Sequence, residues 1–253
     1  MKSKHLPTLS AILCAAAMFT AFISTSCSDK KPAPENQYNA PYIGYTMNHD
    51  EETDAGRINV QIPYYHMSDD QTKDAVEDGF TDFVLKTAKD YILYANPTGF
   101  YDYRIDNVVF GCVREKFVSS FSSGAFTDES SDRPEILTYA VNASPLSGSV
   151  YKTEDLIADF DILAEAFKAG EFSLTYGYPD LLKETNYEDL ISGYSSLYSI
   201  YPAIYFRDEG DTVKLSMVIE LVYDLGGYAE FSIDVDTVKD ALTETCLALL
   251  SRD

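Results

Sequence analysis

The stretch from Tyr205 to Asp234 constrains the fold of this 253-residue chain more than any other part of it. Residues 213–221 alternate and are dense in β-branched and aliphatic side chains, as in a strand. The segment before them, 208–211, contains a glycine, which tolerates the positive φ of a tight turn. Adjacent glycines then break the pattern, and a strand resumes at Tyr228. The stretch therefore predicts two or three consecutive strands joined by short turns.

Residues 1–26 have the three parts of an export signal: a basic start, an apolar run and a small-residue cleavage region. The apolar run is too short for a comfortable membrane span. The segment that ends at Cys27 resembles a relaxed bacterial lipobox, although Ser24 stands where an aliphatic residue is usual. Cys27 is therefore expected to carry a lipid such as palmitate and to become the new N-terminus. Ordinary signal cleavage nearby is the alternative.

Residues 27–56 are polar and contain several prolines, so they are expected to form a flexible tether. Ser28 directly follows Cys27, and the Asp associated with inner-membrane retention is absent there. The protein is thus expected at the outer membrane or the cell surface. Residues 57–253 are expected to form one domain, which could divide into subdomains at 57–101 and 102–253.

The remaining periodicities indicate how helices and strands alternate. Residues 57–66 alternate as a strand, and apolar residues between Ser68 and Ala95 recur at the three- and four-residue spacing of a long helix. A β-rich region follows up to residue 143, and a final helix is expected from Asp234 or Asp236. The predicted fold class is α+β, with antiparallel sheets packed by a long N-terminal helix and a C-terminal helix.

The charge of the chain is strongly acidic, with 41 Asp and Glu against 19 Lys and Arg and a net charge of −22. Removal of the signal with Lys2 and Lys4 would leave −24. A negative field of this size disfavours nucleic acid and favours cationic partners.

The sequence shows no motif typical of catalysis or metal binding. His49 and His66, the histidines beyond the signal, do not stand at metal-ligand spacing. A glycosidase needs two carboxylates, but the close acidic pairs fall where turns and helix caps explain them: Asp69 and Asp70, Asp159 and Asp161, Asp208 and Asp211, and Asp234 and Asp236. No cofactor or metal is expected.

Two cysteines lie in the part of the chain after the tether, Cys112 and Cys246. In an oxidising envelope they could form a disulfide, which would stabilise the fold by about 2–4 kcal/mol. Two separately buried thiols are the other interpretation.

Three segments carry a family resemblance: Thr153–Ile157, Ile204–Gly210 and Leu221–Ile233. They resemble parts of the extracytoplasmic domains of RsiV-type anti-sigma factors and of the non-catalytic N-terminal region of PdaC-type peptidoglycan deacetylases. The resemblance extends over residues 57–250 and lies in the order of the elements. Residues 123–126 lack the histidine that the family often carries in a turn at this place.

The resemblance implies a non-catalytic binding domain, because RsiV-type ectodomains bind lysozyme, a small basic protein. The expected partner is a lysozyme-like cationic protein or peptidoglycan glycan. The expected binding surface is rich in tyrosine and acidic residues and comprises Tyr187, Tyr194, Tyr198, Tyr223, Asp224 and Tyr228. A wall-polymer hydrolase that uses a carboxylate pair and a structural component of a surface assembly are the alternatives.

Overall fold

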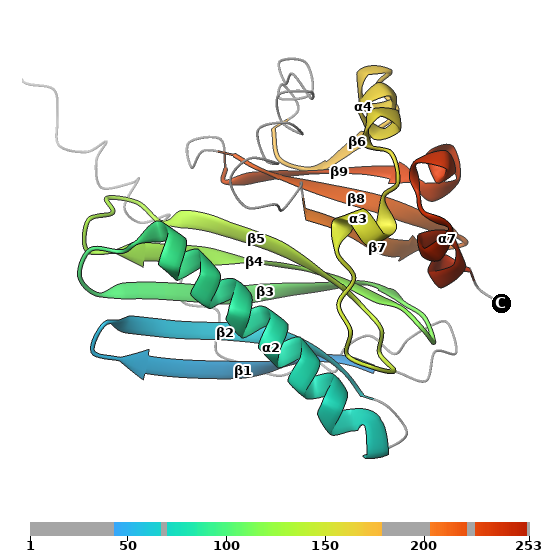
Figure 1. Ribbon diagram of the computed structural model, residues 1–253. Coiled ribbons are helices and arrows are strands. Elements are labelled where there is room, and N and C mark those ends of the chain that lie inside the picture. Colours follow the sequence, from blue (N-terminus) through green and yellow to red (C-terminus); the bar gives the residue numbers. More distant parts are fainter. Residues whose placement is uncertain (1–42, 67–69, 179–202, 222–225, 252–253) are drawn as a thin grey trace, which may run out of the picture. The chain divides into compact units, whose positions relative to one another are not determined.

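The computed structural model describes residues 43–66, 70–178, 203–221 and 226–251. All of these lie in one compact unit, residues 36–253. Their strands form a five-stranded sheet in the order β1-β2-β3-β4-β5 and a four-stranded sheet in the order β6-β9-β8-β7 (Figure 1).

The five-stranded sheet consists of β1 (Ile43–Thr53), β2 (Gly56–His66), β3 (Tyr101–Val113), β4 (Val118–Asp128) and β5 (Glu135–Ala143). Neighbouring strands are antiparallel except β2 and β3, which are parallel. Parallel neighbours need a long crossover connection, and the 26-residue helix α2 (Asp70–Ala95) supplies it. Figure 1 shows α2 running across one face of this sheet.

Helix α2 covers the sheet with a regularly spaced apolar stripe. Phe80, Val84 and Ala88, four residues apart, are buried in one cluster with side chains from β2 to β5. The helix ends at Ala95, and Asn96 adopts the left-handed conformation with φ 48°. The helix expected between Ser68 and Ala95 is therefore confirmed over the described residues.

The four-stranded sheet consists of β6 (Ser173–Tyr176), β7 (Ala203–Glu209), β8 (Thr212–Glu220) and β9 (Tyr228–Asp234), all antiparallel to their neighbours. Gly210, with φ 62°, forms the turn between β7 and β8. The strands expected between Tyr205 and Asp234 are thus confirmed. A second core cluster joins one face of this sheet to side chains of the short helices α3 (Thr153–Leu156), α4 (Phe160–Lys168) and α7 (Glu244–Leu250).

The two sheets are joined through the backbone of β7. The side-chain amide of Asn142 in β5 donates to the backbone carbonyl of Ile204 at 2.7 Å. The backbone amide of Phe206 donates to the hydroxyl of Ser119 in β4 at 2.8 Å. Ser119 also donates to Asn142 at 2.6 Å. A Cβ at Gly111 of β3 would come 2.1 Å from the Phe206 carbonyl oxygen, so the close approach requires glycine there.

A buried ion pair supports the same junction. Arg114, just after β3, donates from Nη1 to Asp208 Oδ2 of β7 at 2.9 Å and from Nη2 to the other carboxylate oxygen. Both side chains are more than nine-tenths buried. A pair removed from water in this way depends on both partners, because either charge left alone would carry its full desolvation cost.

The predicted fold class is wrong. The described part is mostly β-sheet, with 48% of its residues in strands and 27% in helices. It begins with β1 and β2, so no long helix stands at its N-terminus, and α2 is an internal crossover that makes one strand pair parallel. The remaining helices are short, with four, nine and seven residues in α3, α4 and α7.

The predicted final helix also begins later than expected. Two short 3₁₀ turns, Val235–Thr237 and Lys239–Ala241, come first, and α7 starts at Glu244. The backbone from Ala241 to Thr243, just before α7, forms hydrogen bonds with the region around α3. The Ala158 amide donates to Ala241 O at 2.8 Å, and the Thr243 amide donates to Leu156 O at 3.0 Å.

Strand β1 lies within the range that the sequence assigned to the tether. Its 11 residues pair in register with all of β2. Residue 102, where the sequence suggested a subdomain boundary, lies within β3, and its neighbours β2 and β4 belong to the same sheet.

We predict that Arg114→Ala lowers the free energy of unfolding by about 3–5 kcal/mol, because it leaves the Asp208 carboxylate buried without its guanidinium. Urea unfolding followed by far-UV circular dichroism measures this. Arg57→Ala is the matched control, since Arg57 makes a bidentate pair with Asp50 in an exposed position (2.9 and 2.7 Å) and its loss should change stability little. Equal losses in the two variants would contradict the role given to the buried pair.

Candidate functional site

Tyr228 is the member of the expected binding surface that the structure describes. Tyr187, Tyr194, Tyr198, Tyr223 and Asp224 lie outside the described residues, as does Cys27. Tyr228 begins β9 and is half-buried. Its ring stacks on Tyr176 of β6, with centroids 4.5 Å apart and planes at 21°, and lies 5.6 Å from Phe121 of β4.

The side chains around Tyr228 form an exposed aromatic surface. Tyr176 is 49% exposed and Tyr178 is 55% exposed. Tyr178 lies beside Gly226, because a Cβ at that glycine would come 3.4 Å from the tyrosine ring. Tyr176, Tyr178 and Tyr228 are called the tyrosine cluster below.

The binding surface expected from the sequence did not include Tyr176 and Tyr178. The usable signal was the spacing of the two tyrosines around Gly177, since residues two apart in an extended segment point to the same side.

Tight packing holds the cluster in place at the start of β9. Gly226 and Gly227 have φ of 95° and 83°, which a residue with a side chain rarely adopts. A Cβ at Gly227 would come 2.3 Å from Ile136 of β5, so the glycine allows β9 to start against the other sheet. The Leu221 amide donates to Gly227 O at 2.8 Å and closes the connection from β8.

A carboxylate lies next to the cluster. Glu220 is the register partner of Tyr228 and accepts a hydrogen bond from the Thr138 hydroxyl of β5 at 2.9 Å. Partial burial raises the pKa of the Glu220 carboxyl, and the Thr138 hydrogen bond opposes this rise. Burial also raises the pKa of the Tyr228 hydroxyl. The surface thus combines aromatic rings with a hydrogen-bonded acidic group.

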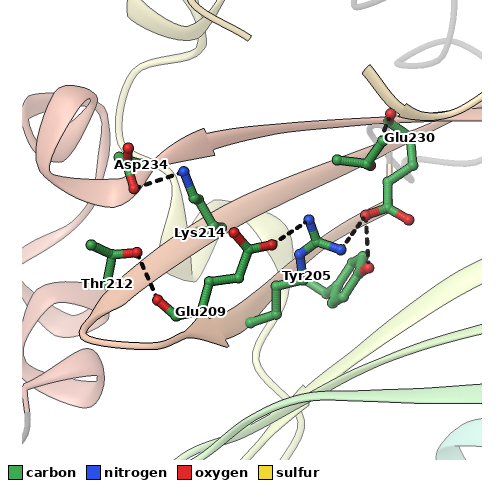
Figure 2. Close-up of polar contacts among 8 residues, drawn as sticks. Tyr205, Glu209, Thr212, Lys214, Glu230 and Asp234 are labelled. Carbon is green, nitrogen blue, oxygen red and sulfur yellow. Dashed lines mark hydrogen bonds and ion pairs between the residues drawn. The ribbon is translucent and has the colours of Figure 1, made fainter. Parts of the chain in front are cut away.

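The rest of this sheet face carries charges that are paired with one another (Figure 2). The Tyr205 hydroxyl donates to Glu230 Oε1 at 2.9 Å, and Arg207 lies 3.3 Å from the same oxygen. Arg207 also contacts Glu209 at 2.9 Å, and Lys214 contacts Asp234 at 2.9 Å. These contacts bind β7, β8 and β9 to one another across the sheet.

In three of the acidic pairs noted in the sequence, one carboxylate has a structural role. Asp159 caps α4 by accepting from the Asp161 amide at 2.9 Å. Asp208 pairs with Arg114, and Asp234 pairs with Lys214. Within the described ranges, no group of three or more His, Cys, Asp and Glu side chains is placed to hold a metal ion.

A shallow pocket of about 200 Å³ lies at the other end of β8 and β9, against α7. Its walls combine acidic and apolar side chains, among them Asp211, Asp236, Val213 and Leu250. The Lys214 ammonium already contacts Asp234, which also lines the pocket.

Cys112 and Cys246 are both buried in the core cluster beneath the four-stranded sheet. The structure holds them as thiols and not as a disulfide. Burial raises the pKa of the Cys246 thiol to about 12, so it stays protonated at neutral pH.

The comparisons with known proteins assign no family to this chain. A scan against protein-family models finds no match. A search of curated proteins finds none either. Among solved structures, the chain is similar to a crystal structure of a member of the DUF3298 family from Bacteroides fragilis, with 12% identity, a TM-score of 0.45, and coverage of 83% of this chain and 97% of that one. A superposition at this level does not establish a common fold.

No helix in the described ranges is long and apolar enough to cross a membrane.

We predict that stability falls as the pH rises above about 9. Burial raises the pKa of Cys246 to about 12 from an ordinary value of 9.0, and burial raises the pKa of the tyrosines Tyr65, Tyr103, Tyr139 and Tyr205 above their ordinary value of 10.0. Between these values the unfolded chain has lost protons that the folded chain retains, so the free energy of unfolding decreases with pH.

Urea unfolding between pH 8 and 11 measures this loss, and Cys246→Ala should make it shallower. Tyrosinate absorbance should rise in two steps, with the buried rings titrating as the protein unfolds. A stability that is constant up to pH 11 would contradict the prediction.

Proposed function

We propose that this protein is a membrane-anchored lipoprotein of the bacterial envelope whose folded domain binds a cationic protein without catalysis. In this proposal residues 1–26 are a signal peptide, Cys27 carries the lipid anchor, and the chain is displayed at the outer membrane or the cell surface. The observation that carries the binding function is the tyrosine cluster beside Glu220, on a chain with a net charge of −22.

The chemistry of this surface suits basic side chains. A tyrosine ring offers a large contact area with few rotatable bonds, and its face attracts an ammonium or guanidinium group. The neighbouring carboxylate adds a charge-assisted hydrogen bond. The net charge of the whole chain would raise the rate of encounter with a basic protein and make it depend on salt.

The other functions considered from the sequence have less support. In three of the carboxylate pairs that a wall-polymer hydrolase would use, one member is engaged: Asp159 at a helix cap, and Asp208 and Asp234 in ion pairs. Exposed tyrosine rings can also stack on sugars, so peptidoglycan is a necessary competitor in any binding experiment. The resemblance to RsiV-type domains makes lysozyme the natural first probe.

We predict that the protein binds lysozyme at low ionic strength and that about 0.5 M salt weakens the complex at least tenfold. The double variant Tyr176→Ala with Tyr178→Ala should weaken it by a similar factor, because exposed aromatic side chains are frequent binding hot spots. Met47→Ala, which removes an exposed apolar side chain from β1, is the control. Isothermal titration calorimetry measures each affinity, and equal binding to soluble peptidoglycan would favour the glycan alternative instead.

We predict that Cys27→Ser moves the protein from the membrane fraction to the soluble envelope fraction and abolishes labelling with a palmitate analogue. The reason is that acyl chains on Cys27 supply the proposed anchor. Cys112→Ala and Cys246→Ala are matched controls, since both thiols are buried and should leave the labelling unchanged. Labelling that persists in Cys27→Ser would refute the lipid attachment site.

A further inference from the structure

A second exposed apolar surface lies at the C-terminal end of α2. Leu93 is 81% exposed, Tyr94 is 53% exposed, and Phe100, just before β3, is 41% exposed. Leu93 and Tyr94 belong to the last turn of the helix. Isolated exposed apolar residues are ordinary, but neighbouring large ones typically mark an interaction site. These three residues are called the apolar tip.

The apolar tip is held in a fixed position. The Asn96 amide donates to Ile92 O at 3.0 Å and closes the helix end. The Thr98 amide donates to Asp128 Oδ2 at 2.9 Å, which ties the turn to the connection between β4 and β5. Asp128 also accepts from the hydroxyls of Ser130 and Ser131, and these hydrogen bonds lower its pKa to about 2, so the carboxylate is charged at neutral pH. A surface ordered before binding loses little entropy in a complex.

The connection from residue 128 to 135 places negative charge directly beside the apolar tip. It carries four acidic residues and one basic residue: Asp128, Glu129, Asp132, Glu135 and Arg133. A Cβ at Gly99 would come 2.2 Å from Glu129 Oε2, so this carboxylate packs against the turn that carries Phe100. The last turn of α2 has no basic residue to balance the negative end of the helix dipole.

The tip is also far from the point where the described chain begins. Tyr101, which follows Phe100, pairs with Gly56 at one end of β2, and Ile43 pairs with His66 at the other end. Eleven residues of extended strand separate these ends by roughly 34 Å. Ile43, the first described residue, therefore lies at the opposite end of the sheet.

We infer that the apolar tip and the acidic connection 128–135 form a docking surface for a basic, amphipathic segment of a partner protein. Its apolar side chains would cover Leu93 and Phe100, and its lysines or arginines would meet the carboxylates and the end of α2. A second copy of this chain would bring the same negative charge to the contact and be repelled. The inference rests on the proposed function in that both require a basic partner, but it places the contact on different residues.

The test uses a 15-residue helical peptide of leucine and lysine with one tryptophan. The protein has no tryptophan, so the fluorescence anisotropy of the peptide reports binding directly. The full chain with Cys27→Ser is used, because an unlipidated protein needs no detergent. We expect saturable binding that Leu93→Ser with Phe100→Ser weakens at least tenfold. Glu129→Gln with Asp132→Asn should weaken it and reduce its salt dependence.

Met47→Ser and Leu247→Ser are the controls, since each removes an exposed apolar side chain elsewhere and should leave the affinity unchanged. Circular dichroism verifies that all variants fold. The inference fails if the peptide does not bind, or if the tip variant binds it as well as the unchanged tip does. The inference would also be overturned if the unchanged protein self-associates and the tip variant does not, because the tip would then be a dimer contact.

The two proposals can fail separately. Tyr176→Ala with Tyr178→Ala should leave peptide binding at the tip intact. Peptide binding without lysozyme binding would refute the lysozyme version of the proposed function and leave the docking surface. Lysozyme binding that depends on the tyrosine cluster, without peptide binding at the tip, would refute the docking surface and leave the proposed function.

Discussion

The hydrogen bonds that Asn142 and Ser119 make to the backbone of β7 are the interaction on which the two-sheet arrangement depends. Strand β7 stands at one edge of the four-stranded sheet, where its outward amides and carbonyls have no further strand among the described residues to pair with. Buried backbone groups must find partners, and here side chains of the five-stranded sheet provide them. Gly111 makes the approach possible by leaving room for the Phe206 carbonyl.

This junction determines which surfaces are available for binding. It buries Tyr205 of β7 against Phe121 of β4, with ring centroids 5.5 Å apart. It leaves Tyr228 half-buried at the start of β9. The charged side chains further along the face are paired across the strands (Figure 2). The tyrosine cluster stays exposed, and so does the apolar tip of α2 on the other sheet. Both surfaces combine exposed rings with carboxylates, which suits a basic partner.

Local sequence patterns predicted the elements whose residues alternate or repeat strongly. The helix up to Ala95 and the strands of 205–234 follow from apolar spacing and from Gly210 at a turn that needs positive φ. Strand β1 was not predicted, because most of its residues are polar and it forms by pairing with β2. The start of the final helix was predicted too early, because the Thr243 amide donates to the Leu156 carbonyl and not to a carbonyl within a helix.

The candidate site was predictable only in part. Tyr228 was identified from its place after the glycine break, but its partners lie about 50 residues earlier in the chain, Tyr176 at the end of β6 and Tyr178 just after it. Pairing between β6 and β9 brings them together. Likewise, nothing local in residues 93–100 indicates that they adjoin the acidic residues 128–135.

By itself, the sequence determined the acidic charge and the alternation of the main strands, because these depend on composition and short-range spacing. The export signal with its cysteine is proposed from the same kind of local pattern. Tertiary structure alone decided the parallel pairing of β2 with β3, the mostly-β class, the junction at β7 and the exposure of the aromatic surfaces. These depend on contacts between residues distant in sequence, and such contacts form only where side-chain shapes and buried hydrogen bonds fit in three dimensions.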